Sequence, residues 1–344
     1  MFQPQLPPTA ADSGPTLSVV FSFRNEQEVL AELIRRCRKV LDGECAKGVL
    51  TDYELVFVND DSTDRSLEIL HEHAVGRRDI KIINMSRNFG VAPCTMAGLE
   101  HARGDAVVYM DADLQDPPET LPEMIAVWQG PQRPDVVHTM RLSRAGESRI
   151  KLAVTRIGYH ILRNLATVDL QIEAGDFKLL SRRAVDQLIQ MSEKNPYLRG
   201  LVSWIGFKQT IVHYHRERRF AGQTKFPILC WPVVRHFLNS AMISFSDIPL
   251  KLAAVSGFMV FLGAFAFIGW IILEKFRGHN IPGWSAIMVT MLFLGGLQQL
   301  FLGFLGLYIK SIYVETKRRP NYIVESKYGF EQPAVSATDV PKAA

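Results

Sequence analysis

One stretch decides the fold of this chain: Val107-Val108-Tyr109-Met110-Asp111-Ala112-Asp113-Leu114-Gln115-Asp116-Pro117-Pro118. Its apolar run indicates a buried strand, which the two prolines end before a helix begins. Because side chains alternate along an extended backbone, Asp111 and Asp113 lie on the same side of it. Two converging carboxylates are costly to keep together unless a cation neutralises them, and their hard oxygen atoms suit Mg²⁺ or Mn²⁺. Alone, the tripeptide is more typical of a solvated turn with helix-capping acids, so the rest of the chain must decide.

Around this stretch, short apolar runs alternate with segments of helical spacing. Strands are predicted at residues 17–23, 53–58, 80–84, 106–110 and 135–140, and helices at residues 28–41, 65–74, 91–102 and 119–129. This order predicts right-handed βαβ units, and therefore a mostly parallel α/β sheet with helices on both faces.

In such a sheet, ligands bind outside the carboxyl ends of the strands. Three of these ends carry acidic residues, and the fifth strand is followed by Arg141. The acidic ends are Arg24-Asn25-Glu26, Asn59-Asp60-Asp61-Ser62 and Asp111-Ala112-Asp113. This combination suits a metal-bound pyrophosphate. The absence of Gly-x-Gly-x-x-Gly and of Gly-x-x-x-x-Gly-Lys argues against a dinucleotide fold and a P-loop.

The composition excludes several classes of function. The chain has 344 residues and a net charge of +4, and its basic and aromatic residues are not interleaved, so nucleic acid is not an expected partner. The four cysteines have no Cys-x-x-Cys spacing, which argues against a disulfide framework and a zinc site. Residues 1–15 lack the basic and apolar regions of a signal peptide and are expected to be a disordered lead.

The second half of the chain contains the features of a membrane protein. Residues 252–273 have no charge over 22 positions, and residues 284–309 have none over 26. Each run exceeds the roughly 20 residues that span a bilayer core, so the unit 251–310 is predicted to form a hairpin of two transmembrane helices. Amphipathic helices are expected at the membrane surface near residues 148–165 and in the juxtamembrane segment 226–250.

The charges that flank the second span set its orientation. Lys310, Lys317, Arg318 and Arg319 follow it, whereas only Lys275 and Arg277 lie in the link. Positive charge favours the cytoplasm, so both termini, the N-terminal domain and a tail at residues 311–344 are expected there. Four glycines in the second span permit close helix packing and hence a homo-oligomer.

Several motifs together resemble one family. They are Ser22-Phe23-Arg24-Asn25-Glu26, Asn59-Asp60-Asp61-Ser62-Thr63-Asp64, Ser86-Arg87-Asn88-Phe89-Gly90, the stretch quoted above, Gly175-Asp176-Phe177 and Ala221-Gly222-Gln223-Thr224-Lys225. In this order they resemble the family 2 glycosyltransferases of the GT-A fold that charge polyprenyl phosphate, such as bactoprenol glucosyltransferases and dolichyl-phosphate mannose synthase. The resemblance covers roughly residues 16–325 and implies a Rossmann-like catalytic domain at residues 16–225.

The resemblance also implies roles for matched residues. The nucleotide-sugar would be bound by Asn25, Glu26, Asp60, Asp111 and Lys225. The divalent metal, Mg²⁺ or Mn²⁺, would be bound by Asp111, Asp113 and Gln115. The acceptor phosphate would be bound by Arg141, Arg144 and Arg149, and the catalytic residues would be Asp113 and Asp176. The chain departs from the family pattern where Asp61 replaces the usual glycine of Asp-Gly-Ser, where Val91 follows Gly90 in place of a lysine, and around Gln223.

The expected function is inverting transfer of a sugar from a nucleotide-sugar, UDP-glucose first, to undecaprenyl phosphate at the cytoplasmic membrane face. The lipid phosphate is largely ionised at pH 7, since its second pKa is about 6, so it needs positioning more than a general base. UDP-aminoarabinose derivatives and GDP-mannose are the alternative donors. A processive polysaccharide synthase lacks support, because the chain has no Gln-x-x-Arg-Trp motif. A non-catalytic membrane lipid-binding module would leave the acidic strand ends unexplained.

Overall fold

The computed structural model describes residues 14–142, residues 174–217 except 192 and 195, residue 220, parts of 255–277, and residues 283–330. Its centre is an eight-stranded sheet with the order β7-β5-β6-β4-β1-β2-β3-β8. The strands are β1 (Thr16–Phe23), β2 (Asp52–Asn59), β3 (Ile80–Met85), β4 (Ala106–Asp111), β5 (Val136–Arg141), β6 (Ala174–Ser181), β7 (Gln209–Tyr214) and β8 (Val324–Tyr328).

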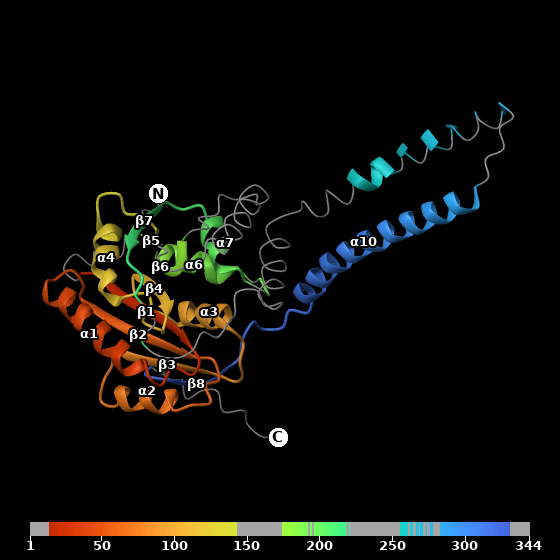
Figure 1. Cartoon of the computed structure of the whole chain (residues 1–344). Coiled ribbons are helices and arrows are strands. Elements are labelled where there is room, and N and C mark those ends of the chain that lie inside the picture. The colour runs from red at the N-terminus through yellow and green to blue at the C-terminus, as the bar shows by residue number, and fades with distance from the viewer. Residues whose placement is uncertain are drawn as a thin grey trace, which may run out of the picture.

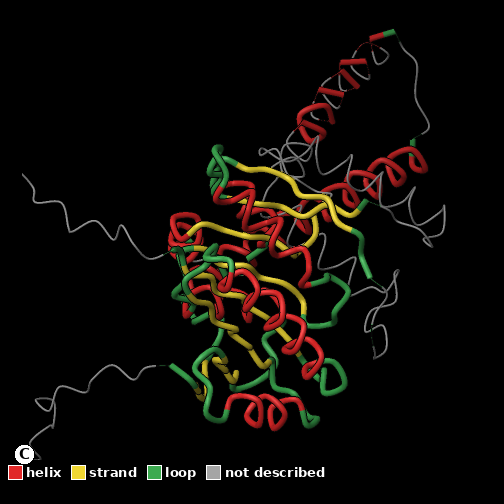
Figure 2. Tube along the Cα trace, turned by 90° about the vertical axis from the view of Figure 1, so that its left-hand side faces the viewer, coloured by secondary structure: helices red, strands yellow, loops and turns green. Residues whose placement is uncertain are grey.

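Helices lie on both sides of the sheet (Figures 1 and 2). They are α1 (Leu30–Ala46), α2 (Ser66–Ala74), α3 (Val91–His101), the short 3₁₀ helix η1 (Pro118–Thr120), α4 (Leu121–Gln129), α6 (Arg182–Gln190), α7 (Leu198–Trp204) and α10 (Trp284–Thr316). The expectation of a mostly parallel α/β sheet is confirmed, because β1 pairs in parallel with β2 and β4, β2 with β3, and β5 with β7.

Two strands run against the others, β6 between β4 and β5, and β8 beside β3. Since β6 is antiparallel to both of its neighbours, β4 and β5 run in the same direction. The carboxyl ends of β1 to β5 and β7 therefore share one edge with the amino ends of β6 and β8. We call this the ligand edge. It brings Asp176, near the start of β6, to the same edge as Asp111, at the end of β4.

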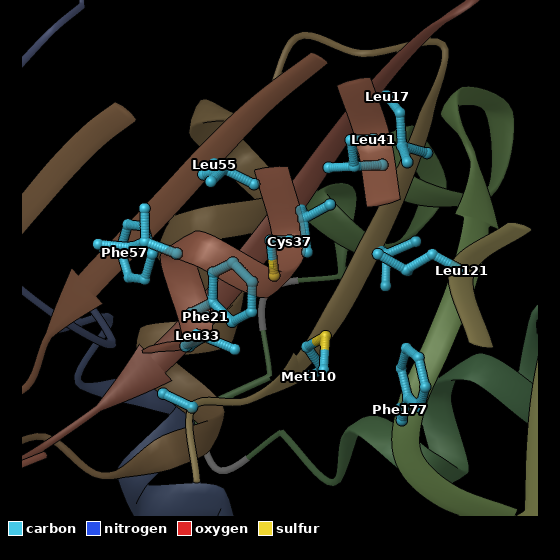
Figure 3. Close-up of a cluster of buried hydrophobic side chains, with 14 of the residues drawn as sticks. Leu17, Phe21, Leu33, Cys37, Leu41, Leu55, Phe57, Met110, Leu121 and Phe177 are labelled. Carbon is cyan, nitrogen blue, oxygen red and sulfur yellow. The ribbon is translucent and has the colours of Figure 1, made fainter. Parts of the chain in front are cut away.

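One face of the sheet packs against α1, α2 and α4. Phe21 and Phe57 stack on each other in this core with ring centroids 4.8 Å apart, and Leu33 and Cys37 of α1 are fully buried nearby. Figure 3 shows these side chains together with Met110 and Phe177, so β4 and β6 contribute to the same cluster. Strand β4 is thus paired with β1 on one side and β6 on the other, and one of its faces packs on this core. Together these contacts fix the position of Asp111 at its end.

The other face packs against α3, α6 and α7. In α3, a β-carbon at Gly98 would clash with the side chain of Val20, so the helix approaches β1 more closely than any other residue would allow. Ser181 caps α6, because its hydroxyl oxygen accepts the amide proton of Ala184 at 3.2 Å. These features fix the helices that border the ligand edge.

One helix in the described part of the chain is long and apolar enough to cross a membrane, Phe293–Thr316 within α10. It projects away from the sheet (Figure 1), and the side chains that the structure describes in it are not buried. Of the two predicted spans, 284–309 therefore lies in a helix. The first, 252–273, is described only in helical fragments such as 255–260, so the two-helix hairpin stays a prediction. The expected helices at 148–165 and 226–250 and the N-terminal lead up to residue 13 lie outside the described residues.

The segment after α10 differs from the predicted tail at 311–344. The helix continues to Thr316, and Val324–Tyr328 returns to the sheet as β8 beside β3. Tyr322 donates a hydrogen bond to the carboxylate of Glu100 in α3, and the amide of Asn321 donates to the carbonyl oxygen of Glu193 at 2.6 Å. Residues that follow α10 are thus part of the same fold as the sheet. The tail beyond Phe330 lies outside the described residues.

Candidate active site

The quoted stretch forms the end of β4 and a tight loop. Asp111 is the last residue of the strand, and Asp113 is 7% exposed. One carboxylate oxygen of Asp113 accepts the amide proton of Gln115 at 3.1 Å, which closes the turn. Between them Leu114 has a φ of 55°, a conformation that is uncommon for a leucine. The loop keeps this strained residue because its side chain is fully buried in the core.

Four carboxylates converge beside this loop. The pKa of Asp111 is raised to about 7, first by burial and then by the negative charges of Asp176, Asp113 and Asp116. The pKa of Asp116 is also raised by burial, although the hydroxyl of Tyr214 donates to it. Carboxylates in such a group repel one another, so the site favours a cation.

Asp176 has a cationic partner of its own. Arg199 of α7 donates two hydrogen bonds to it, one at 2.6 Å from Nε and one from a terminal nitrogen. Partial burial alone would raise the pKa of Asp176, but the hydrogen bonds and charge of Arg199 outweigh it and hold that pKa below its ordinary value. Asp176 is therefore a weak base and a persistent negative charge.

Basic side chains face the carboxylates from β5 and from the segment after β7. Arg141 ends β5, and its Nε donates to the hydroxyl oxygen of Tyr214 at 3.3 Å. Arg216 donates to the side-chain oxygen of Gln115, and its Nε lies 3.9 Å from a carboxylate oxygen of Asp116. These guanidinium groups place positive charge at the edge of the carboxylate group.

The segment that carries Arg216 is fastened on both sides. The amide of Glu217 donates to the carbonyl oxygen of Gln115 at 3.0 Å. The carboxylate of Glu217 accepts from Arg36 of α1, which also binds Glu119. Glu217 is thus held over the loop after β4, immediately before the glycine-containing basic segment that ends at residue 225.

The ends of β1 and β2 are joined by hydrogen bonds. The amide of Asn25 donates to the hydroxyl oxygen of Ser62 at 3.0 Å, and its side-chain oxygen accepts the amide proton of Thr63 at 2.8 Å. The amide of Glu26 donates to the hydroxyl oxygen of Ser66 at 2.9 Å. The two loops therefore form one unit at the ligand edge.

Asp60 lies in the same region but binds protein groups. Its two carboxylate oxygens accept the amide protons of Phe89 at 2.7 Å and Gly90 at 3.0 Å, just before α3 begins. Asp61, beside it, has a φ of 56°. This left-handed conformation explains why glycine is usual at that position in the family pattern, and why aspartate, which tolerates it better than most residues, can replace it.

Comparison with known proteins identifies the family. Residues 18–189 match the family described as Glycosyl transferase family 2. The chain is 41% identical to the uncharacterized glycosyltransferase YkcC of Bacillus subtilis strain 168, over 91% of this chain and 94% of that protein. This chain belongs to glycosyltransferase family 2.

Two further matches extend the comparison. The bactoprenol glucosyl transferase of Shigella phage SfV is 34% identical over 90% of this chain and 98% of its own length. The mannosyltransferase PcManGT of Pyrobaculum calidifontis, solved in complex with GDP-Man and Mn²⁺, is 17% identical, with a TM-score of 0.44 over 89% of this chain and 88% of that one. The family match and these relatives confirm the resemblance predicted from the motifs, and the chain is a glycosyltransferase.

The predicted site residues of this family 2 enzyme fall into three groups. The structure brings five of them to the ligand edge around the β4 loop, namely Asp111, Asp113, Gln115, Arg141 and Asp176. Asn25, Glu26 and Asp60 follow β1 and β2 at the same edge. Arg144, Arg149 and Lys225 lie outside the described residues. Their binding roles stay predictions.

Gln115 and Asp60, predicted to bind the metal and the nucleotide-sugar, are engaged by protein groups, as are several other predicted site residues described above. The side-chain oxygen of Gln115 accepts from Arg216, and the carboxylate of Asp60 accepts from two backbone amides. No group of three or more His, Cys, Asp or Glu side chains within the described ranges is arranged to hold a metal ion.

The sequence did not identify three residues that shape the site, Arg199, Tyr214 and Arg216. Arg216 lies in residues 213–225, a stretch that contains three arginines and a lysine. Composition therefore gave a signal for it, although only Lys225 was assigned a role. Arg199 follows no motif, and only the packing of α7 against β6 brings it to Asp176.

Proposed function

We propose that this enzyme transfers glucose from UDP-glucose to undecaprenyl phosphate at the cytoplasmic face of the membrane. The products are the glucosyl phospholipid, inverted at the anomeric carbon, and UDP. The observation that carries the proposal is the group of carboxylates at the ligand edge, with Asp111 and Asp113 at its centre and Arg141 on its border. Near-full-length relatives named bactoprenol glucosyl transferase support glucose and a polyprenyl lipid.

A divalent cation, Mg²⁺ or Mn²⁺, would be held by Asp111 and Asp113. The raised pKa of Asp111 is consistent with this, because burial raises it first and the charges of Asp176, Asp113 and Asp116 raise it further, and a bound cation would offset both effects. Mg²⁺ commonly binds through one or two carboxylates and completes its ligands with substrate phosphates and water. When bound, the cation neutralises the charge that develops on the leaving nucleoside diphosphate. Gln115 would become a third ligand once Arg216 released it.

Arginines would bind the phosphate of the acceptor lipid. Arg141 is oriented by Tyr214, whose hydroxyl is in turn held by Asp116. Planar guanidinium groups match phosphate oxygens in pairs, which positions the nucleophile as well as attracting it. Arg144 and Arg149 would extend this contact toward the membrane surface.

The reaction needs no strong base in this arrangement. An ionised oxygen of the lipid phosphate forms the new bond to the anomeric carbon while the bond from that carbon to the UDP oxygen breaks, so the electron pair leaves with UDP. Asp176, held by Arg199, keeps its negative charge, and we propose that it orients the sugar and the incoming phosphate electrostatically. Asn25, Glu26 and Asp60 would form the nucleotide side of the site, and Lys225 would contact the pyrophosphate.

The acceptor would arrive from the membrane. Phe293–Thr316 is the described candidate span, and residues 252–273 would be the second. A β-carbon at Gly257 would lie 4.0 Å from Phe301 of α10, which supports two adjacent helices. The cations at residues 317–319 support a cytoplasmic C-terminus. The glycines of α10 would permit a homo-oligomer.

The test is a donor screen with the purified full-length protein and undecaprenyl phosphate. UDP-glucose should yield UDP and a glucosylated lipid, and a chelator of divalent cations should stop the reaction. Turnover with only GDP-mannose or a UDP-aminoarabinose derivative would replace the donor in the proposal. Lipid binding without turnover of any donor would instead favour a non-catalytic lipid-binding module.

The metal assignment is tested by Asp113→Ala. We expect this variant to lose transfer by about 10²-fold or more, since electrostatic stabilisation of the leaving group is lost, while it stays folded. Asp186→Ala, which removes an exposed carboxylate of α6, should leave the rate unchanged. Near-normal activity of Asp113→Ala, measured as UDP release, would refute the metal assignment.

A further inference from the structure

A continuous chain of hydrogen bonds crosses the ligand edge from β8 to the loop after β1. The side-chain nitrogen Nδ2 of Asn84 donates to Glu325 Oε2 at 2.6 Å, and Nδ2 of Asn59 donates to Asn84 Oδ1 at 2.7 Å. The backbone amide of Ser62 donates to Asn59 Oδ1 at 3.1 Å, and the amide of Asn25 donates to the Ser62 hydroxyl oxygen at 3.0 Å. We call these five residues the polar chain. It follows the ends of three neighbouring strands, since Asn59 and Asn84 are register partners.

The Glu325 carboxylate at one end and the backbone amide of Ser62 further along together fix the direction of the bonds between them. A carboxylate only accepts hydrogen bonds, so Asn84 must present its amide nitrogen to Glu325 and its oxygen to Asn59. Asn59 must then present its nitrogen to Asn84, which leaves its oxygen for the amide of Ser62. Both asparagine side chains are thereby fixed in one orientation, and hydrogen bonds in series polarise and strengthen one another.

The other end of the polar chain is a strained loop. Asn25 has a φ of 55°, and Asp61, next to Ser62, has a φ of 56°. Residues in this conformation persist where surrounding bonds determine them. The amide of Ser62 and the amide of Asn25 are two such bonds, so loss of the polar chain should loosen the loop that follows β1.

Glu325 is separated from the membrane helix by a short link. Residues 317–323 join α10 to β8, and the amide of Ser86 donates to the carbonyl oxygen of Ile323 at 3.0 Å. The position of β8 is thus tied on one side to α10 and on the other to β3. The polar chain connects this membrane-proximal strand to the nucleotide side of the site.

We infer that Glu325, through the polar chain, positions Asn25 for the donor nucleotide. The inference rests on the proposed function, because it assigns the nucleotide to the loops after β1 and β2. Glu325 is then a positioning residue, and the strand that follows the membrane helices is part of the donor site. A loosened loop lowers affinity for the nucleotide and leaves the chemistry of the bound donor largely intact.

The experiment compares variants of the full-length enzyme. Glu325→Ala and Asn84→Ala should raise the KM for the nucleotide-sugar about three- to tenfold, the effect of one ordinary hydrogen bond, with kcat within about twofold of the wild type. Glu325→Gln should restore most of the affinity, since its side-chain oxygen can still accept from Asn84. Glu325→Lys should be worse than Glu325→Ala, because a donor-only group forces both asparagines to turn.

The matched control is Tyr322→Phe. It removes a hydrogen bond to the carboxylate of Glu100, on the same segment but outside the polar chain. If Glu325 acted only by holding β8 in place, Tyr322→Phe, which also loosens this segment, would change KM as Glu325→Ala does. We expect it to lower thermal stability and leave KM unchanged. An equal rise of KM in both variants would overturn the inference.

Hydrogen exchange separates this inference from the proposed function. The amides of Asn25 and Ser62 should exchange faster in Glu325→Ala than in the wild type and in Tyr322→Phe, whether or not any donor is turned over. Unchanged exchange of both amides would overturn the polar chain as a positioning device. Faster exchange in a protein that turns over no nucleotide-sugar, and binds UDP no more weakly than the wild type, would refute both the donor assignment and the role of Glu325 in it.

Discussion

At the scale of single residues, Asp176 shows how the chain separates charge from basicity. Its carboxylate faces Asp111 and receives two hydrogen bonds from Arg199, which keep its pKa low. Among the described residues no arginine or lysine is hydrogen-bonded to Asp111, and burial together with the neighbouring carboxylates raises its pKa to about 7. The two carboxylates thus differ in pKa, as the proposed roles of an orienting group and a cation ligand require.

We expect Asp176→Asn to lower kcat by about 10²-fold, because the amide keeps the shape but removes the charge that Arg199 and the substrate meet. The initial rate of UDP release, with thermal unfolding as a check of folding, measures this. Asp186→Asn removes an exposed carboxylate and serves as the control. Unchanged turnover in Asp176→Asn would make Asp176 a structural partner of α7 and nothing more.

Asp61 gives a prediction about stability. Its φ of 56° is accessible to aspartate and glycine but strained for a β-branched side chain. Asp61→Val should therefore destabilise the protein by about 1–2 kcal/mol, whereas Asp61→Gly should be close to neutral. Thermal unfolding of both variants measures the difference. Equal stability of Asp61→Val and Asp61→Gly would show that the loop relaxes out of this conformation.

At the scale of elements, the reversed strand β6 accounts for much of the site. It inserts Asp176 between the ends of β4 and β5, and it also buries Lys178 beside His138. Lys178 Nζ lies 3.1 Å from His138 Nδ1, and Gln209 Oε1 lies 2.7 Å from the other ring nitrogen. Since the glutamine oxygen can only accept, the histidine donates to it and accepts from Lys178.

Burial lowers the pKa of Lys178 to about 7, and this predicts a pH dependence of stability. The ordinary pKa of lysine is near 10.4, so the folded protein holds the proton less tightly than the unfolded chain. The stability available above pH 10 is lost as pH falls through about 7. Lys178→Met should therefore exceed the wild type by about 2 kcal/mol at pH 6, with a difference that shrinks toward pH 10.

Denaturation at pH 6, 8 and 10 measures this trend. Lys208→Met, at an exposed lysine just before β7, provides the control and should show no such trend. A constant difference between Lys178→Met and the wild type across this range would mean that Lys178 keeps its ordinary pKa in the folded protein.

The elements also show what the sequence could and could not predict. The strands that end at Phe23, Asn59 and Asp111 are apolar and buried on both faces, so their pattern was clear. Strand β8 is a short, mostly exposed edge strand with two charged side chains, Glu325 and Lys327, and such strands carry little periodic signal. The partnership of Arg199 with Asp176 depends on the packing of α7, which no local pattern encodes.

At the scale of the whole molecule, the sheet and α10 are joined through a link of few residues. Residues 317–323 can span at most about 25 Å when fully extended, so β8 and the sheet stay near the C-terminal end of α10. In the proposed function, a lipid phosphate at the membrane surface and a nucleotide-sugar from solution would therefore meet at one site. This geometry is productive only if the sheet and the C-terminal segment lie on the cytoplasmic side, where nucleotide-sugars are made.

That orientation gives a prediction about topology. In intact cells, a membrane-impermeant thiol reagent should label a cysteine introduced by Asn280→Cys, in the link between the two predicted spans, but not one introduced by Ser336→Cys. Cys45 and Cys230 are replaced in both, and Cys37 and Cys94 are buried. Permeabilised cells should label both positions, which controls for reactivity. Labelling of Ser336→Cys in intact cells, with Asn280→Cys protected, would invert the topology and place the active site away from its donor. Protection of both would mean that the link never crosses the membrane, so that the chain would not form a hairpin of two spans.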